Sequence, residues 1–255
     1  MRIARFKRSG RIAYGIVEDQ SVEEISSTPF LPYERTGEVR ALEDVRLLSP
    51  CMPSKVAAVA LNYSDHVKEM GKQVPTHPAF FFKPSTAVVG PLDTVVAPPG
   101  CERLDYEGEL SVVIGSVARS VDPAHAKDVI LGYTCGIDAT ARDFQSEDLQ
   151  WGRAKGFDTS APLGPWIETE LDPADLALTT RVNGSVKQSG RTCDMVFSAP
   201  VLVAFVSRYV TLLPGDVIMT GTPAGIGPMV DGDRCTVEIE GIGTLEVGVK
   251  GPVSK

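Results

Sequence analysis

The sequence predicts a mostly β protein of the α+β class, and three observations support this prediction. The 255 residues include 24 glycines and 19 prolines, which supply the many turns that a β-rich fold needs. Short runs of alternating or continuous apolar residues recur along the chain at the length of strands. Asn183-Gly184 separates two such runs, a strong signal for a β-hairpin. With 43% hydrophobic residues, the chain can bury a full core.

The first 50 residues are predicted to form a small N-terminal β domain. The runs RIARFKR, RIAYGIVE and SVEEI alternate as strands around tight turns such as Ser9-Gly10, which is typical of an antiparallel meander. Pro53-Ser54 then mark a boundary near residue 50. We therefore assign residues 1–50 to this domain and residues 51–255 to a larger one.

The larger domain is predicted to mix buried strands with short helices. Its strands are KVAAVAL, AFFFKPSTAVVG, LDYEGELSVVIG, VILGYTCGI and residues 216–220, followed by a closing hairpin around Gly241-Ile242-Gly243. Its helices run from Ser64 as N-cap to Gly71, over about Ala139 to Leu149, and from Ser198 to about Leu212, with a further short helix at Asp122-Pro123.

Composition excludes several functional classes. The five cysteines are odd in number and form no CxxC pair, which argues against a disulfide framework or a zinc cluster and for a reduced, cytoplasmic protein. A net charge of −8 argues against nucleic-acid binding. The N-terminus has no apolar run of the secretory type, and the longest apolar stretch is too short to span a membrane. The absence of GxSxG and HExxH argues against an α/β-hydrolase serine and a zinc hydrolase.

The most informative stretch is LDYEGELSVVIG, residues 104–115. As one β-strand, it places Tyr106 and the apolar residues on a core face and Glu107 and Glu109 on the other. Two carboxylates roughly 5 Å apart repel by about 3 kcal/mol at an effective dielectric near 20, so in a pocket a shared proton or a cation must relieve the repulsion. The alternative is an amphipathic strand with a solvated acidic face.

Four other polar residues have both a functional and a plainer interpretation. His66 and Glu69 share a face of their short helix, where the carboxylate would orient the imidazole as a general base; the alternative is a surface pair at a helix end. Asp138 follows a buried strand as a third carboxylate, or as the N-cap of the next helix. Lys155 lies in a glycine- and proline-rich loop, where a solvated lysine is the default.

Glu107, Glu109 and Asp138 would together form an all-oxygen site for a hard cation, Mg²⁺ or Mn²⁺. One divalent ion among three carboxylates leaves a charge of −1, so Arg142 and Lys155 nearby would make room for an anionic ligand. Spacing alone does not join these residues, because they lie on separate elements.

The glycine-rich run GTPAGIGP, residues 221–228, is a further candidate for binding an anion. It lacks the GK[ST] ending of a phosphate loop, and Pro228 stands where the helix of a dinucleotide fingerprint should begin. Its backbone amides would still suit a carboxylate or an oxyanion.

Seven motifs, in order, make the chain resemble the fumarylacetoacetate hydrolase (FAH) family from about Lys55 to Gly248: LNYSDHVKE, FFKPSTAVVGP, LDYEGELSVVIG, GIDATARDFQ, AKGFDTSAPLGP, VNG and GDVIMTGTPAGIG. The resemblance implies a rolled, barrel-like mixed β-sheet, a small N-terminal β domain and a homodimer. The chain looks closest to the short members that act as acylpyruvases, oxaloacetate decarboxylases and 2-hydroxyhepta-2,4-diene-1,7-dioate isomerases, and the resemblance implies a role in the breakdown of aromatic compounds.

The resemblance also implies a role for each candidate residue. Mg²⁺, with Mn²⁺ as the alternative, would be held by Glu107, Glu109 and Asp138 and would chelate the 2-oxo-carboxylate end of a 2,4-dioxo acid. His66 with Glu69 would activate water, and Lys155 would hold the enolate charge that forms as the C–C bond breaks. The residues expected to bind the substrate are Lys83, Ser85, Arg142, Gln145 and Thr222.

Three functions remain open on the sequence. The first is hydrolysis of an acylpyruvate such as fumarylpyruvate, for which His66 and Glu69 suit water activation. The second uses the same metal and enolate for decarboxylation of oxaloacetate or for isomerisation of a 2-hydroxy-dienedioate. The third is a non-catalytic β-rich binding protein with a structural cation site, although a site with open positions is typical of catalysis. The loop from Lys72 to Pro78 is expected to act as a lid that selects the substrate.

Overall fold

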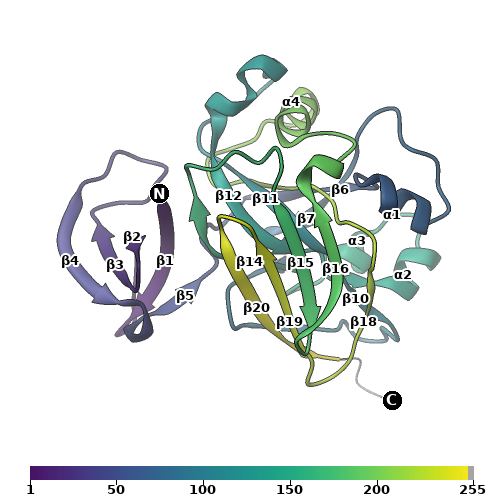
Figure 1. Ribbon diagram of the computed structural model, residues 1–255, viewed down its shortest axis with the longest axis horizontal. Helices are drawn as coiled ribbons and strands as arrows, with labels where there is room; N and C mark the ends of the chain where they lie inside the picture. The colour runs from purple at the N-terminus through teal and green to yellow at the C-terminus, as the bar shows by residue number, and fades with distance from the viewer. Residues whose placement is uncertain (252–255) are drawn as a thin grey trace.

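The structure, a computed structural model, describes residues 1–251 and is built mainly from β-strands in three sheets (Figure 1). Strands pair both antiparallel and parallel within the same sheet, as where β17 (Val217–Met219) runs parallel to β6 (Lys55–Ala60). The predicted mostly β fold of the α+β class is therefore confirmed. Among the described residues, no helix is long and apolar enough to cross a membrane.

Five N-terminal strands continue the main sheet: the first three form the predicted antiparallel meander, and the last two were not predicted. They are β1 (Arg2–Arg8), β2 (Arg11–Glu18), β3 (Ser21–Ile25), β4 (Arg35–Ala41) and β5 (Arg46–Leu48). β1 pairs with β2, with β5 and also with β14 (Ala161–Glu168), so the meander is hydrogen-bonded to the rest of the molecule. Figure 1 shows β1–β4 at one side of the molecule. The division into domains at residue 50 stays a prediction.

The main sheet has the strand order β4-β3-β2-β1-β14-β12-β11-β17-β6-β7, with β8 beside β14. Its remaining strands are β7 (Ala79–Pro84), β8 (Val88–Val89), β11 (Gly108–Ile114) and β12 (Ile130–Ile137). The central strands are apolar and buried along most of their length, as β6, β11 and β17 show. Continuous apolar runs are typical of strands covered on both faces.

Two smaller sheets complete the fold, and the five-stranded one is the covering sheet, which packs against β11, β12 and β14. One has the order β13 (Thr140–Ala141), β10 (Leu104–Tyr106), β18 (Gly227–Met229). The other has the order β16 (Ser185–Arg191), β15 (Ala177–Val182), β19 (Arg234–Ile239), β20 (Gly243–Lys250), β9 (Thr94–Val96). Both predicted hairpins are confirmed, and Asn183 and Gly184 have φ of 50° and 79°, as the tight turn requires.

The stretch at residues 104–115 corrects the prediction of one strand with a core face and a polar face. It forms β10 and β11, which belong to different sheets, and the strand is interrupted at Glu107. Both faces are buried, because Asp105, Glu107, Glu109 and Ser111 are as inaccessible as the apolar residues between them. The side that alternation alone assigns to solvent is buried within the main sheet itself, because Val113, on the same side of β11 as Glu109, packs in one cluster with residues of β6, β14 and β17.

The helices are short and differ in detail from those predicted. They are α1 (Ser64–Glu69), α2 (Arg142–Glu147), α3 (Gly152–Lys155), α4 (Ala199–Tyr209) and the 3-10 turns η1 (Leu42–Asp44), η2 (Ser85–Ala87), η3 (Pro123–Val129) and η4 (Thr192–Asp194). The N-cap of α1 is Tyr63, not Ser64, whereas the predicted Gly71 does end the helix, with φ of 63°. The helix predicted over Ala139 to Leu149 is shorter, and α4 ends at Tyr209 rather than near Leu212.

Candidate metal centre and active site

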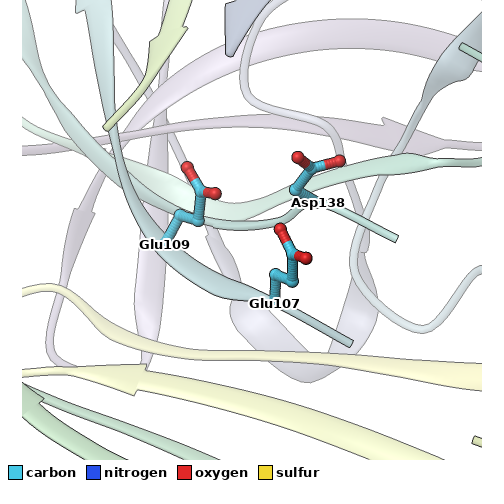
Figure 2. Close-up of side chains that lie close together, drawn as sticks. All are labelled: Glu107, Glu109 and Asp138. Carbon is cyan, nitrogen blue, oxygen red and sulfur yellow. The ribbon is translucent and has the colours of Figure 1, made fainter. Parts of the chain in front are cut away.

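Three carboxylates from two neighbouring strands converge inside the molecule. Glu109 lies on β11, Glu107 immediately precedes it, and Asp138 follows the end of the adjacent strand β12. One oxygen from each lies within 4.8 Å of the others, and all three residues are buried. Figure 2 shows their carboxyl groups gathered around a common space. The sheet register therefore joins residues that spacing alone could not join.

Gly108 separates the two glutamates because the neighbouring sheet leaves no room for a side chain there. A Cβ atom at this position would lie 2.1 Å from Thr180 Oγ1 and 3.0 Å from a methyl carbon of Val237, both on the covering sheet. Contacts that short require the sheets to move apart. The glycine thus lets β15 and β19 pack directly against the backbone between the two carboxylates.

Two buried lysines partly neutralise these carboxylates. Lys155 Nζ donates to Glu107 Oε2 at 2.9 Å and to Asp138 Oδ2 at 2.7 Å. Burial lowers the pKa of Lys155, but Asp138 and Glu107 outweigh that effect and the pKa is raised. Lys83 Nζ lies 2.7 Å from Asp138 Oδ1 and donates to the Ser160 carbonyl. The interpretation of Lys155 as a solvated surface lysine is therefore wrong.

Arg142 is a further cation of this group and binds the Glu107 oxygen that Lys155 leaves free. Its guanidinium donates to Glu107 Oε1, to Asp105 Oδ2 at 2.9 Å and to the Gln145 side-chain oxygen. Asp105 is fully buried and also pairs with Arg103. Asp138 does not cap α2, because the N-cap of that helix is Ala141 and Asp138 faces the lysines instead.

The two glutamates have opposite pKa shifts although only Gly108 separates them. Burial opposes the ionisation of Glu107, but Lys155 and Arg142 together lower its pKa to about 2. For Glu109, burial and the nearby charges of Asp138 and Glu107 raise the pKa well above its ordinary value. Among the described residues, Glu109 forms no ion pair within 4.0 Å; its carboxylate accepts one hydrogen bond, from the Gly221 amide at 2.7 Å.

His66 and Glu69 form a hydrogen-bonded pair, as their helical spacing predicts. His66 Nδ1 lies 2.8 Å from Glu69 Oε2, and His66 is buried at the cavity wall rather than on the surface. The other Glu69 oxygen accepts a hydrogen bond from the Gly225 amide at 2.9 Å. A Cβ atom at Gly225 would lie 2.3 Å from the Lys187 carbonyl oxygen, so only glycine fits there. The imidazole is therefore held through a carboxylate that is itself anchored.

The amides of the glycine-rich loop are already occupied by carboxylates of the protein. The Gly221 amide donates to Glu109, the Ala224 amide to Asp65 at 3.2 Å, and the Gly225 amide to Glu69. The prediction that these amides suit carboxylates is right in chemistry, but these three are not free for a substrate. The loop instead connects the acidic group to helix α1.

The site opens into a cavity of about 580 Å³. The candidate residues that line it are His66, Glu107, Glu109, Asp138, Arg142, Gln145, Lys155 and Thr222. Glu69 lies behind His66. Lys83 is fully buried behind Asp138, and Ser85 is exposed on η2; neither belongs to the cavity lining. Of the expected lid, Lys72 lines the cavity.

The donor set fits a hard divalent cation. All three side chains offer oxygen, which Mg²⁺ and Mn²⁺ prefer. Asp138 Oδ1 accepts no hydrogen bond within the described part of the chain, even though Lys83 lies close to it, and Glu109 lacks a cationic partner there. A buried carboxylate that no cation balances is costly, and a bound cation would remove that cost.

Sequence reasoning missed three residues that build this site. Asp105 holds Arg142, and Asp65 ties helix α1 to the glycine-rich loop. Gln188 on β16 hydrogen-bonds to Gly108 and Thr222 from the covering sheet. Asp105 had a signal, since it shares strand parity with the two glutamates, whereas the other two act through contacts more than 70 residues apart in sequence.

Two family models match the chain. Residues 55–250 match the model described as Fumarylacetoacetate (FAA) hydrolase C-terminal. Residues 1–50 match the model described as Rv2993c-like, N-terminal. The first match covers the metal-site residues and the cavity.

Curated relatives resemble the chain over most of its length. Protein Rv2993c of Mycobacterium tuberculosis is 47% identical over 96% of this chain and 96% of its own. The human mitochondrial oxaloacetate tautomerase FAHD2A is 43% identical over 79% of this chain and 68% of its own.

Solved structures are similar across the whole chain. The 2-hydroxyhepta-2,4-diene-1,7-dioate isomerase from Mycobacterium marinum has a TM-score of 0.92 and 44% identity, with 100% of both chains covered. The maleylpyruvate hydrolase from Sphingobium sp. SYK-6, in complex with manganese (II) ion and pyruvate, has a TM-score of 0.82 and 33% identity, with 99% of this chain and 100% of its own covered.

Proposed function

This chain belongs to the fumarylacetoacetate hydrolase family, and within that family we propose that it is a metal-dependent hydrolase that cleaves a C–C bond of a 2,4-dioxo acid, an acylpyruvate such as fumarylpyruvate. One observation carries the proposal: the carboxylate triad, Lys155 and the His66–Glu69 pair meet at a single cavity. The Mn²⁺ and pyruvate in the related maleylpyruvate hydrolase support a cation and a 2-oxo acid as its ligands.

Glu107, Glu109 and Asp138 would hold the cation, Mg²⁺ in our proposal. A bound divalent ion polarises a 2-oxo group and stabilises the negative charge that develops on it. The chain's own cations surround the same space: Arg142 and Lys155 contact Glu107 directly. They give an anionic substrate a positive environment when the cation is present.

Arg142, Gln145 and Thr222 would orient the substrate. Arg142 and Gln145 are hydrogen-bonded to each other on one wall, and Thr222 lies on the glycine-rich loop. Fixing both ends of a dioxo acid between these side chains would place its distal carbonyl near His66. Lys83 and Ser85 have no part in this proposal because neither lines the cavity.

His66 would activate the attacking water. With Nδ1 donating to Glu69, Nε2 carries a free lone pair that can accept a proton. The water oxygen bonds to the distal carbonyl carbon, and the bond from that carbon to the pyruvate methylene breaks. The released electron pair forms the pyruvate enolate, whose charge Lys155 would stabilise. Protonation of the methylene carbon then yields pyruvate.

A second candidate function is proton transfer alone, as a tautomerase or isomerase of a 2-oxo or 2-hydroxy diacid. The specific observation in its favour is that relatives named as an oxaloacetate tautomerase and a dienedioate isomerase have higher identity to this chain than the named hydrolase. The His66–Glu69 pair and Lys155 could move a proton on and off an enolate without water attack.

Product analysis with Mg²⁺-loaded protein separates these functions. Fumarylpyruvate should yield fumarate and pyruvate in equal amounts. Keto–enol interconversion of oxaloacetate without cleavage of fumarylpyruvate would replace the hydrolase proposal with the tautomerase. Pyruvate and CO₂ from oxaloacetate would indicate a decarboxylase.

The proposal also predicts the effect of His66→Ala. Hydrolysis should fall by about 10²- to 10⁴-fold, the usual contribution of a general base. Mn²⁺ affinity, measured by electron paramagnetic resonance, should stay within about twofold of the wild type, because His66 is outside the triad. An equal loss of Mn²⁺ binding would make His66 a ligand rather than a base.

The homodimer and the cytoplasmic location expected above remain proposals. Light scattering after size-exclusion chromatography measures whether the chain forms a homodimer. The five free cysteines, four of them buried, support a reducing compartment.

A further inference from the structure

A closed ring of hydrogen bonds surrounds the peptide between the two glutamates. The Gly108 amide donates to Gln188 Oε1 at 3.0 Å, and Gln188 Nε2 donates to Thr222 Oγ1 at 2.7 Å. Thr222 Oγ1 in turn donates to the Gly108 carbonyl at 2.8 Å. Both polar groups of Gly108 are thus bound by side chains rather than by a neighbouring strand.

Gln188 is the residue that closes this ring. It is 1% exposed and comes from β16, a strand of the covering sheet that contributes no other hydrogen bond to the acidic group. Its second Nε2 hydrogen is donated to the Pro223 carbonyl at 2.8 Å. One side chain therefore ties the metal-site strand to the glycine-rich loop.

The ring controls the geometry of the carboxylates on either side of it. Glu107 and Glu109 are attached to the two ends of the Gly108 unit, and Glu109 is also held by the Gly221 amide, next to Thr222. Rotation of either peptide at Gly108 would move one carboxylate relative to the other. Ligand oxygens must stay within a few tenths of an ångström for a small ion such as Mg²⁺, so this backbone needs external support.

Only an amide at position 188 satisfies all partners together. The site needs an acceptor toward Gly108 and two donors toward Thr222 and Pro223, which an amide provides. A carboxylate would keep the acceptor but would face the Pro223 carbonyl without a hydrogen. Thr222 would then donate to that carboxylate and release the Gly108 carbonyl.

We infer that Gln188 is a positioning residue for the metal site, which acts through Gly108 and Thr222 to set the separation of Glu107 and Glu109. The inference rests on the proposed metal site but not on the proposed reaction. It deepens that proposal because it assigns the β15–β16 hairpin a role in supporting the metal ligands. Gln188 does not line the cavity, so it would affect the cation without touching it or the substrate.

The test measures Mn²⁺ affinity and the electron paramagnetic resonance spectrum of the bound ion in the full-length chain. In Gln188→Met the dissociation constant should rise about 10- to 100-fold, the usual effect of removing a partner that orients metal ligands. The spectrum should broaden as the ligand geometry becomes heterogeneous. Gln188→Glu, which keeps the acceptor for Gly108, should show a smaller loss.

Thr180→Val provides a matched control. Thr180 pairs with Gln188 across the hairpin and packs against Gly108, but its Oγ1 has no hydrogen-bond partner within the described residues. This variant should bind Mn²⁺ within about twofold of the wild type with an unchanged spectrum. Leu178→Ala, which removes buried packing on the same strand, controls for a general loss of stability.

Unchanged Mn²⁺ affinity in Gln188→Met would overturn the inference, and so would an equal loss of Mn²⁺ affinity in Thr180→Val. A third contrary outcome is that Leu178→Ala, if it lowers the melting temperature as much as Gln188→Met does, also loses at least as much Mn²⁺ affinity. If Gln188→Met does not fold, Gln188→Glu and Thr222→Val provide the test, and their double variant should lose less affinity than the sum of the single losses because both break one ring. Wild-type protein that binds no Mn²⁺ would instead refute the metal site itself.

Discussion

Two charged networks of this protein each pair one basic side chain with two carboxylates, but in opposite surroundings. On the N-terminal meander, Arg35 pairs with Glu18 and Glu23, and Arg35 is 46% exposed. At the candidate metal centre, Lys155 pairs with Glu107 and Asp138, and Lys155 is 3% exposed. Figure 1 shows β2–β4 at one side of the molecule and helices α1–α3 at the other.

The difference between the networks is the cost of an unbalanced charge. Water solvates any exposed group whose partner is removed, so pairs on the meander contribute little. In the buried centre an unpaired charge has no such compensation, and removal of one partner is strongly destabilising. The buried network also contains one carboxylate, Glu109, that the described protein groups do not balance. This imbalance gives the centre a capacity for a cation that the meander lacks.

The largest effect should come from Lys155→Met. It leaves Glu107 and Asp138 without their shared cation, and we expect the free energy of unfolding to fall by about 3–5 kcal/mol in urea titrations. Activity should be lost as well. Lys187→Met, at an exposed site, is the control and should change stability little. A loss below about 1 kcal/mol for Lys155→Met would show that the buried pairs are not important for stability.

The pH dependence of the metal-free protein should be the next largest effect. The pKa of Glu107 is about 2 when folded, against an ordinary value of 4.5, so the unfolded chain binds its proton more readily. The ionised Glu107 carboxylate stabilises the fold fully above about pH 4.5, and this stabilisation is lost as the pH falls toward 2. The difference between the two pKa values of Glu107 corresponds to about 3 kcal/mol.

Urea unfolding at a series of pH values in chelator measures this loss. Lys155→Met should show a flatter decline, because Lys155 contributes to the low pKa of Glu107. Parallel curves for the two proteins would contradict the assignment of the low pKa to this contact.

Glu109→Gln should have the opposite effect on stability and make the metal-free protein more stable. The raised pKa of Glu109 means that folding disfavours its ionised form, so neutralisation should stabilise the metal-free protein at pH 7. We expect the free energy of unfolding to rise by about 0.5–2 kcal/mol, and each kcal/mol raises the melting temperature by roughly 2–4 °C. The variant should also lose Mn²⁺ binding. Glu107→Gln, two residues away, breaks pairs to Lys155 and Arg142 and should lower the melting temperature. The same sign for both variants would refute the contrast.

The smallest effect should come from Arg35→Ala on the meander. Its pairs are exposed and screened by salt, so the melting temperature should change by less than about 2 °C, and the change should shrink further in 0.5 M NaCl. Differential scanning calorimetry at low and high salt measures this directly. A shift as large as that of Lys155→Met would remove the distinction between the two networks.

The local elements of this fold follow from local patterns. The meander, both hairpins and the buried strands were predictable because alternation, glycine turns and apolar runs act over a few residues. Helix bounds were less accurate: Asp138 was predicted as a possible cap, but the structure assigns that position to Ala141. Capping depends on where neighbouring strands end, which a short window does not contain.

The candidate site likewise has features that local sequence predicts and features that depend on tertiary contacts. The sequence by itself determined the helical contact of His66 with Glu69, because that contact depends only on the period of one helix. It also brought Glu107 and Glu109 close together, because a single residue separates them. Only the tertiary structure decided that both faces of the acidic stretch are buried and that Lys155 balances two carboxylates. It also decided that the Gly221 amide holds the Glu109 carboxylate and that Gln188 holds the backbone of Gly108. These contacts join residues 48, 112 and 80 positions apart. Their burial and charge balance depend on how separate sheets pack, which no local pattern specifies.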